Sequence, residues 1–171
     1  MPRPLNLPPR AALAAALLAF SGYAASASEV WRPLAEAGLG EGAGVCSGAD
    51  GGKLCFGLRC AEGFGKVGAA WFLLSEDPVL DKDGASYVGL AVAGGGVHRL
   101  TMRPVAAIGS ASLLETPLDS QAQAGLLADL ETGEGLRPHL RGAILGSLPL
   151  DGAKSQIARV LSLCAGPDGR S

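Results

Sequence analysis

The sequence predicts a mainly β domain of the α+β class, built as an antiparallel sheet or partial sandwich with two helices. Short apolar runs separated by turn residues fill the middle of the chain, which is the pattern of successive β-strands. Two later segments have apolar residues at helical spacing. The four cysteines form an even number, which predicts two disulfides in an exported chain. We therefore expect the C-terminal helix to pack on the sheet and to be disulfide-linked to it.

The amino end has the three parts of a cleavable secretory signal. Arg3 and Arg10 form a basic start, Ala11–Phe20 is an unbroken apolar run, and Ala25-Ser26-Ala27 is a small-residue cleavage site. The run is much shorter than the roughly 20 apolar residues that span a bilayer, so a retained anchor is the weaker interpretation. We expect a secretory signal at 1–27, an Ala/Gly-rich lead-in at 28–44, a single disulfide-stapled domain at 45–166 and a short tail at 167–171.

Export predicts that the mature chain is periplasmic or secreted, and no later stretch is apolar enough to predict a transmembrane span. Removal of Arg3 and Arg10 leaves 12 of the 14 basic side chains against 16 acidic ones, a net charge of −4. These charges are interspersed along the sequence, whereas nucleic acids and anionic membranes bind clustered positive charge. The expected partner is therefore an unknown protein or envelope component, and the oligomeric state stays open.

The positions of the cysteines favour one of the three possible disulfide pairings. Asp50-Gly51 is a strong two-residue hairpin turn, and counting outward from it places Cys46 opposite Cys55. At such a non-hydrogen-bonded pair the Cα atoms lie about 4.5 Å apart, within the roughly 4.4–6.8 Å that disulfides accept. Cys46–Cys55 and Cys60–Cys164 are therefore the favoured pairs. A zinc site with four thiolate ligands is the weaker alternative because Cys164 is far along the chain from the others.

Strand signals begin near the first cysteines and continue to the middle of the chain. Val67–Leu74 is apolar on both faces, which predicts a central strand. Gly94–Gly96 is expected to be a three-residue hairpin loop that places Val92 opposite His98. The alternating glycines of 38–44 predict a flexible linker, because no phosphate-loop Gly-Lys-Ser/Thr follows them. The other expected strands are Lys53–Cys60, Ser86–Ala93, Val97–Arg103, Val105–Leu114, Gly135–Leu140 and Gly142–Leu148.

Two helices are expected after these strands. Ser120-x-x-Gln123 is a capping-box pattern that starts the first helix, and Gly133 is expected to end it. The second helix is expected to begin with Asp151 as its N-cap and to stop at Gly166-Pro167. The apolar stripes are Ala122, Leu126, Leu127 and Leu130 in the first helix, and Ala153, Ile157, Val160, Leu161 and Cys164 in the second.

Reactive side chains are few, and none forms a recognisable catalytic motif. His98 is expected on the inward face of its strand, where a hydrogen-bonded, partly buried histidine is the usual case. A Ser-His-Asp triad built on His98 is the weaker interpretation. His139 has no nearby cysteine or carboxylate pair to activate. We therefore predict no catalytic residue and no cofactor.

The acidic residues are interpreted as parts of turns rather than as metal ligands. Asp81-Lys82-Asp83-Gly84 begins like a calcium loop, but the twelfth position is Val92 and cannot ligate. The alternative to a polar turn is a weak cation site formed by Glu76, Asp77, Asp81 and Asp83. Glu115 and Asp119 flank Pro117 and are expected in a loop and at the start of a helix. We predict no metal site.

Two short motifs carry a resemblance to a known family. Cys55-Phe56-Gly57-Leu58-Arg59-Cys60 follows a tryptophan, and Leu148-Pro149-Leu150-Asp151-Gly152-Ala153 leads into the segment that ends at Cys164. In this layout, over residues 43–164, the chain resembles small exported bacterial proteins of the invasion-associated locus B type. The resemblance implies a β-rich, periplasmic or surface-associated protein without established catalysis. Cys164 departs from the layout of that family, and the resemblance assigns no functional residue.

The leading hypothesis is an exported, non-catalytic binding or envelope-accessory protein of unknown ligand. It follows from export, two disulfides and the lack of a reactive constellation. The glycine loops or the strand that holds Trp71 and Phe72 are the expected contact regions. The first alternative is an inhibitor of an exported hydrolase such as a lysozyme or protease, because a preorganised loop loses little entropy on binding. The second alternative is a small hydrolase that uses His98.

Overall fold

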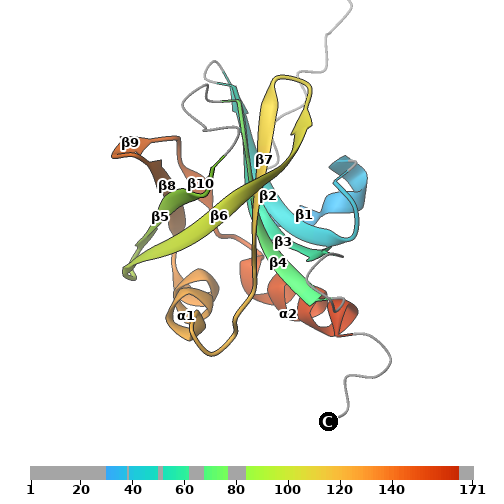
Figure 1. Ribbon diagram of the computed structural model, residues 1–171. Helices are drawn as coiled ribbons and strands as arrows, with labels where there is room; N and C mark the ends of the chain where they lie inside the picture. The colour runs from blue at the N-terminus through green and yellow to red at the C-terminus, as the bar shows by residue number, and fades with distance from the viewer. Residues whose placement is uncertain (1–29, 38, 50–51, 62–67, 77–83, 166–171) are drawn as a thin grey trace, which may run out of the picture.

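A strongly bent antiparallel sheet with two helices on one face forms the framework of the molecule (Figure 1). The computed structural model describes residues 30–37, 39–49, 52–61, 68–76 and 84–165. Within these residues the sheet has ten strands, in the order β1-β2-β3-β4-β7-β6-β5-β8-β10, and β9 also pairs with β8. This confirms the predicted fold class. The strands are β1 Arg32–Pro33, β2 Gly42–Ala49, β3 Gly52–Ala61, β4 Gly68–Ser75, β5 Ser86–Ala93, β6 Val97–Ile108, β7 Ala111–Pro117, β8 Gly135–Leu140, β9 Ala143–Ile144 and β10 Leu148–Pro149.

The long strand β6 joins two halves of the sheet (Figure 1). Its Val97–Met102 part pairs with β5, and its Arg103–Ile108 part pairs with β7. The register shifts between Pro104 and Ala106, at a proline that has no N–H to give to the ladder. We call β1–β4 with β7 the N-terminal half-sheet, and β5 and β6 with β8, β9 and β10 the hairpin half-sheet.

The main core lies between the two half-sheets and the helices α1 (Ala124–Thr132) and α2 (Ala153–Cys164). Its aromatic centre is Phe56, whose ring stacks on Trp71 with centroids 5.4 Å apart and meets the edge of Trp31. Both halves of the sheet reach this core, so β6 bends around it. The buried helical residues are Leu126 and Leu130 of α1, and Ala153, Ile157, Val160 and Cys164 of α2.

A second, smaller core covers the opposite face of the N-terminal half-sheet. The 3-10 turn η1 (Leu34–Ala37) and Leu39 lie over Phe72 and Leu74, which alternate along β4 with the main-core residues Trp71 and Leu73. Strand β4 is therefore apolar on both faces, as expected for a central strand.

Residues 30–37 and 39–44 of the lead-in are part of the fold, so the prediction of a flexible linker was wrong for 39–44, and Gly38 lies outside the described residues. Trp31 is 2% exposed, and its backbone N–H donates to the Asp151 carbonyl at 2.9 Å. The glycines serve close packing here. A Cβ on Gly57 would lie 2.5 Å from the Gly44 Cα and 2.8 Å from Cε1 of Phe72. The ring of Phe72 therefore needs the space that Gly44 and Gly57 leave.

The structure contains the two disulfides that the sequence favoured. Cys46 faces Cys55 in the β2–β3 register, with Cα atoms 4.0 Å apart. The Asp50-Gly51 turn that led to this pairing lies outside the described residues. Cys60 is bonded to Cys164, with Cα atoms 5.2 Å apart, which confirms that the C-terminal helix is linked to the sheet. This bond joins residues 104 positions apart, and a closure of that length stabilises the fold by roughly 4–5 kcal/mol in the chain-entropy model.

The β5–β6 hairpin has a different register from the one predicted. His98 lies opposite Leu90 instead of Val92, because the pairing with β6 ends at Ala91 and Val92 donates its N–H to the Gly96 carbonyl at 3.0 Å. The displacement is two residues, and an even displacement leaves every side chain on its expected face. The inward residues are Val88, Leu90, Val92, Leu100 and Met102, and all are buried.

Two predicted strands have wrong boundaries. Val105–Leu114 was expected as one strand, but Gly109, at a φ of +63°, turns the chain between β6 and β7. Gly142–Leu148 was also expected as one strand and is instead the separate strands β9 and β10. Gly146 lies between these strands at a φ of +158°.

Both helices begin differently from the capping predictions. Asp119, not Ser120, accepts the backbone N–H groups of Gln121 and Ala122 before α1, and the first helical residue is Ala124. Helix α2 has Gly152, at a φ of +79°, in place of Asp151 as its N-cap. Gly133 ends α1 as predicted, and Gly166-Pro167 lies outside the described residues. Within the described ranges, neither helix has the length and apolar character needed to cross a bilayer.

Candidate binding face

The hairpin half-sheet has one face in the main core and the other face exposed. The alternation is regular along β5, where Val88 and Leu90 are buried while Tyr87 is exposed. We call the exposed side the outer face. It consists of Tyr87, Gly89, Ala91 and Ala93 on β5, Val97, Arg99, Thr101 and Arg103 on β6, Arg137 and His139 on β8, and Ile144 on β9.

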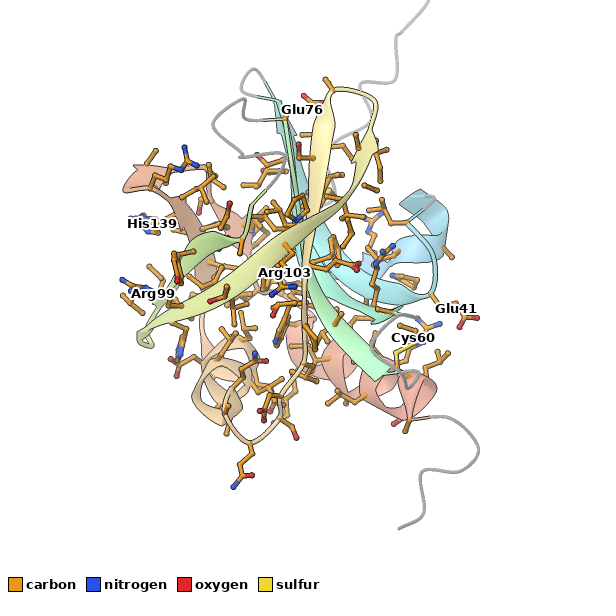
Figure 2. All side chains as sticks on the ribbon, in the orientation of Figure 1. Glu41, Cys60, Glu76, Arg99, Arg103 and His139 are labelled. Atoms are coloured by element: carbon orange, nitrogen blue, oxygen red, sulfur yellow. A yellow bond between two sulfur atoms is a disulfide. The ribbon has the colours of Figure 1, made fainter. Side chains whose placement is uncertain are left out.

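Cross-strand pairing places these side chains in rows. Gly89 is flanked by Arg99 on β6 and by His139 on β8. Figure 2 labels Arg99 and His139 on this half of the molecule. Ala91 is flanked in the next row by Val97 and Arg137. A Cβ on Gly89 would meet nothing nearer than the His139 Cβ at 3.5 Å, so the position is open. The centre of the outer face is thus a strip of small residues, Gly89, Ala91 and Ala93, between larger side chains.

The outer face is basic. Strands β5, β6, β8 and β9 contain no Asp or Glu, and they expose Arg99, Arg103 and Arg137. Within the described part of the chain, none of these three arginines forms an ion pair with a carboxylate. The guanidinium of Arg99 lies 6.0 Å from the centroid of the Tyr87 ring, a cation–π arrangement. The sequence contains no basic stripe, yet strand register gathers these arginines on one surface.

The outer face also carries the most exposed large apolar side chains of the described residues. Val97 is 78% exposed, Tyr87 65% and Ile144 61%. A hollow of about 360 Å³ opens at one end of the strip, along the end of β5 and the start of β8. Its lining includes Ala91, Ala93, Glu134, Arg137 and Ser147.

His98 and Asp129 fasten the tip of this hairpin to α1. The His98 Nε2 lies 2.7 Å from the Asp129 Oδ2, which also accepts the Gly96 N–H at 2.7 Å. The Gly96 hydrogen bond, followed by that of His98, lowers the pKa of the Asp129 carboxyl. A Cβ on Gly95 would lie 2.6 Å from the Asp129 Cγ, so the glycine loop allows this close approach.

Each histidine lies on the face of its strand that the alternation of side chains predicts. His98 is inward-facing and partly buried with a hydrogen-bonding partner, and His139 is on the outer face. The Asp129 carboxylate accepts a hydrogen bond from His98, but no serine hydroxyl is bonded to His98 among the described residues. The arrangement holds the hairpin loop against α1.

Glu115 is a strand residue, which corrects its placement in a loop. It lies in β7, is 6% exposed, and pairs with Arg59 of β3. Arg59 also donates to the Leu39 carbonyl at 3.4 Å, so the pair joins the sheet to the lead-in.

The remaining acidic candidates form no metal centre in the described part of the chain. Glu76 accepts the Lys53 N–H at 2.9 Å and the Ser110 hydroxyl at 3.3 Å. Asp77 and Asp81–Asp83 lie outside the described residues. No group of three or more potential metal-ligating side chains occurs in the ranges that the structure describes.

One predicted contact region is buried, and the sequence did not predict the outer face. Trp71 and Phe72 are both 0% exposed, so their strand cannot meet a partner. The arginines of the outer face are separated in sequence. Alternate residues of a strand lie on the same face, and the pairing of β6 and β8 with β5 brings these arginines onto one surface. The exposed Gly94–Gly96 loop lies at one end of this outer face.

Comparison with known proteins adds little to this geometry. Neither a scan against protein-family models nor a search among curated proteins finds a match. Among solved structures, the chain is similar to invasion associated protein B from Bartonella henselae, with a TM-score of 0.38 and 16% sequence identity. The match covers 71% of this chain and 90% of that chain. A similarity at this level carries no conclusion about function.

Proposed function

We propose that the protein is an exported, non-catalytic binding domain that contacts its partner through the outer face. One observation carries this proposal: Tyr87, Val97 and Ile144 are the most exposed large apolar side chains of the described residues, and they lie on one surface with arginines that pair with no carboxylate among those residues. Monomeric proteins rarely gather exposed apolar side chains without an interaction that uses them. Tyr and Arg are enriched at protein interfaces, whereas Lys, Glu and Asp are depleted.

The construction of the outer face suits binding. Its strands are fixed by backbone pairing on both sides of β5, and the hairpin tip is held by Asp129. A surface that is ordered before association loses little conformational entropy when the partner binds. Two disulfides are consistent with an extracytoplasmic protein, because such bonds persist in oxidising compartments. We place the mature protein in the periplasm or the extracellular medium.

Site-specific photocross-linking in the expressing cells tests the proposal. A photoreactive residue at Thr101, in the outer face, should give a discrete adduct with a partner that mass spectrometry can identify. The same residue at Ser162, exposed on α2, is the matched control and should give none. Tyr87→Ala should strongly weaken the Thr101 adduct. Equal adducts at both positions, or none at Thr101 with the protein folded and exported, would contradict the proposal.

A further inference from the structure

The chemistry of the outer face indicates what kind of partner it accepts, if the proposed function holds. We infer that the partner presents an extended acidic polypeptide segment, which lies along the strip of Gly89, Ala91 and Ala93. Two of its carboxylates, on alternate residues, meet the two rows of the outer face. One lies over Gly89, between Arg99 and His139, and the other lies over Ala91, beside Arg137.

The preference for an anionic partner follows from the charge distribution. The mature chain has more acidic than basic side chains, but β5, β6, β8 and β9 carry no acidic residue. Arg99 and Arg137 have no carboxylate partner among the described residues, so their donors are available to a ligand. Packing against Tyr87 holds Arg99 at the row of Gly89, which reduces the entropy lost when it binds a carboxylate.

The other side chains favour a polypeptide over a nucleic acid or a membrane surface. Tyr87, Val97 and Ile144 place apolar area between the basic groups, which suits a partner with mixed acidic and apolar side chains. A phosphate polymer would need continuous positive charge, yet Glu134 lines the hollow at one end of the strip. The positive charge consists of arginine guanidinium groups, whose planar forks match carboxylates in two-point hydrogen bonds.

The spacing of the rows favours an extended segment with acids on alternate residues. Gly89 and Ala91 are two residues apart on β5, which corresponds to about 6.5–7 Å along a strand. Same-side residues of an extended peptide repeat at this distance. A carboxylate at one position of the segment therefore reaches the row of Arg99 and His139, and a carboxylate two residues away reaches Arg137.

Synthetic peptides provide the probe, with binding to the full mature protein measured by fluorescence anisotropy. A short peptide of alternating Glu and Leu should bind, and its Kd should rise with salt because screening weakens exposed charge contacts. A peptide of the same composition, with the glutamates in adjacent pairs separated by pairs of leucines, should bind about tenfold more weakly, because no two glutamates are then two residues apart and only one carboxylate meets a row. The peptide with Gln in place of Glu should not bind measurably.

Variants of the outer face locate the peptide. Arg99→Glu and Arg137→Glu should each raise the Kd of the alternating peptide by about tenfold or more. Arg159→Glu, on exposed α2, is the matched charge control and should change the Kd little. Gly89→Val blocks the strip without backbone strain, since its new Cβ has only an ordinary contact with His139, and it should also abolish binding. Circular dichroism and thermal unfolding show that each variant is folded.

The outcomes separate this inference from the proposed function. If Thr101 cross-links to a partner but the alternating peptide binds no better than its Gln counterpart, the outer face binds and its partner is not an acidic segment. Comparable or tighter binding of duplex DNA or of phosphatidylglycerol vesicles would overturn the inference in favour of a phosphate ligand. Self-association that Arg99→Glu abolishes would make a second copy the occupant and would also overturn it.

Discussion

The face of the sheet opposite the main core is divided into a covered and an uncovered part. On the N-terminal half-sheet, Leu34 and Leu39 cover Phe72 and Leu74, and the buried carboxylate of Glu115 is paired with Arg59. On the hairpin half-sheet the same face exposes Tyr87 and leaves its arginines without carboxylate partners among the described residues. The covered face thus pairs its buried charge, whereas the outer face leaves its arginines without a carboxylate in the described ranges, and this difference supports the proposal that the outer face meets a partner.

The largest contrast between these two parts should appear when an aromatic residue is removed from each. Phe72→Ala leaves a cavity under the lead-in and should lower the free energy of unfolding by about 3–5 kcal/mol. Tyr87→Ala, in the exposed part, should change it by no more than about 0.5 kcal/mol. Urea unfolding at neutral pH with the disulfides intact measures both. Similar losses for the two variants would show that the outer face is also part of the structural core.

The second contrast concerns charge. Glu115→Gln removes the carboxylate that pairs with Arg59, and the partly buried guanidinium then faces a neutral amide, at a cost of about 1–3 kcal/mol. The matched control is Arg103→Gln on the uncovered side, since Arg103 is the cross-strand neighbour of Glu115 and is exposed. Its effect on urea unfolding should stay within about 0.5 kcal/mol.

A double-mutant cycle checks the cause of the Glu115 effect. If the ion pair is responsible, Arg59→Met combined with Glu115→Gln should destabilise the protein by less than the sum of the single changes. Strict additivity would contradict a direct coupling between these two side chains.

The sequence was informative where local patterns set the structure and uninformative where distant segments meet. Apolar spacing predicted the buried faces of β4, β5 and α2, because side-chain direction follows directly from strand and helix geometry. The lead-in was misjudged because its glycines serve the packing of Phe72, a residue far away in the chain. The basic outer face was missed for the same reason, since Arg99 and Arg137 become neighbours only through the pairing of both β6 and β8 with β5.

The smallest expected effect concerns the clamp that holds the hairpin of the outer face to α1. The Gly96 N–H and His98 lower the pKa of Asp129 in the folded state, so the clamp stabilises the protein above the unfolded pKa of about 3.9. That contribution is lost as the pH falls through the lower pKa of the folded state. The gap in urea midpoint between the protein and Asp129→Asn should therefore be constant near neutral pH and should close below about pH 4. Asp151→Asn, which alters an exposed carboxylate without a side-chain partner among the described residues, should show no such gap. If the difference in urea midpoint persisted to the lowest pH at which the protein folds, Asp129 would act through its shape and not through its charge. The hairpin tip would then be held in acid as firmly as at neutral pH.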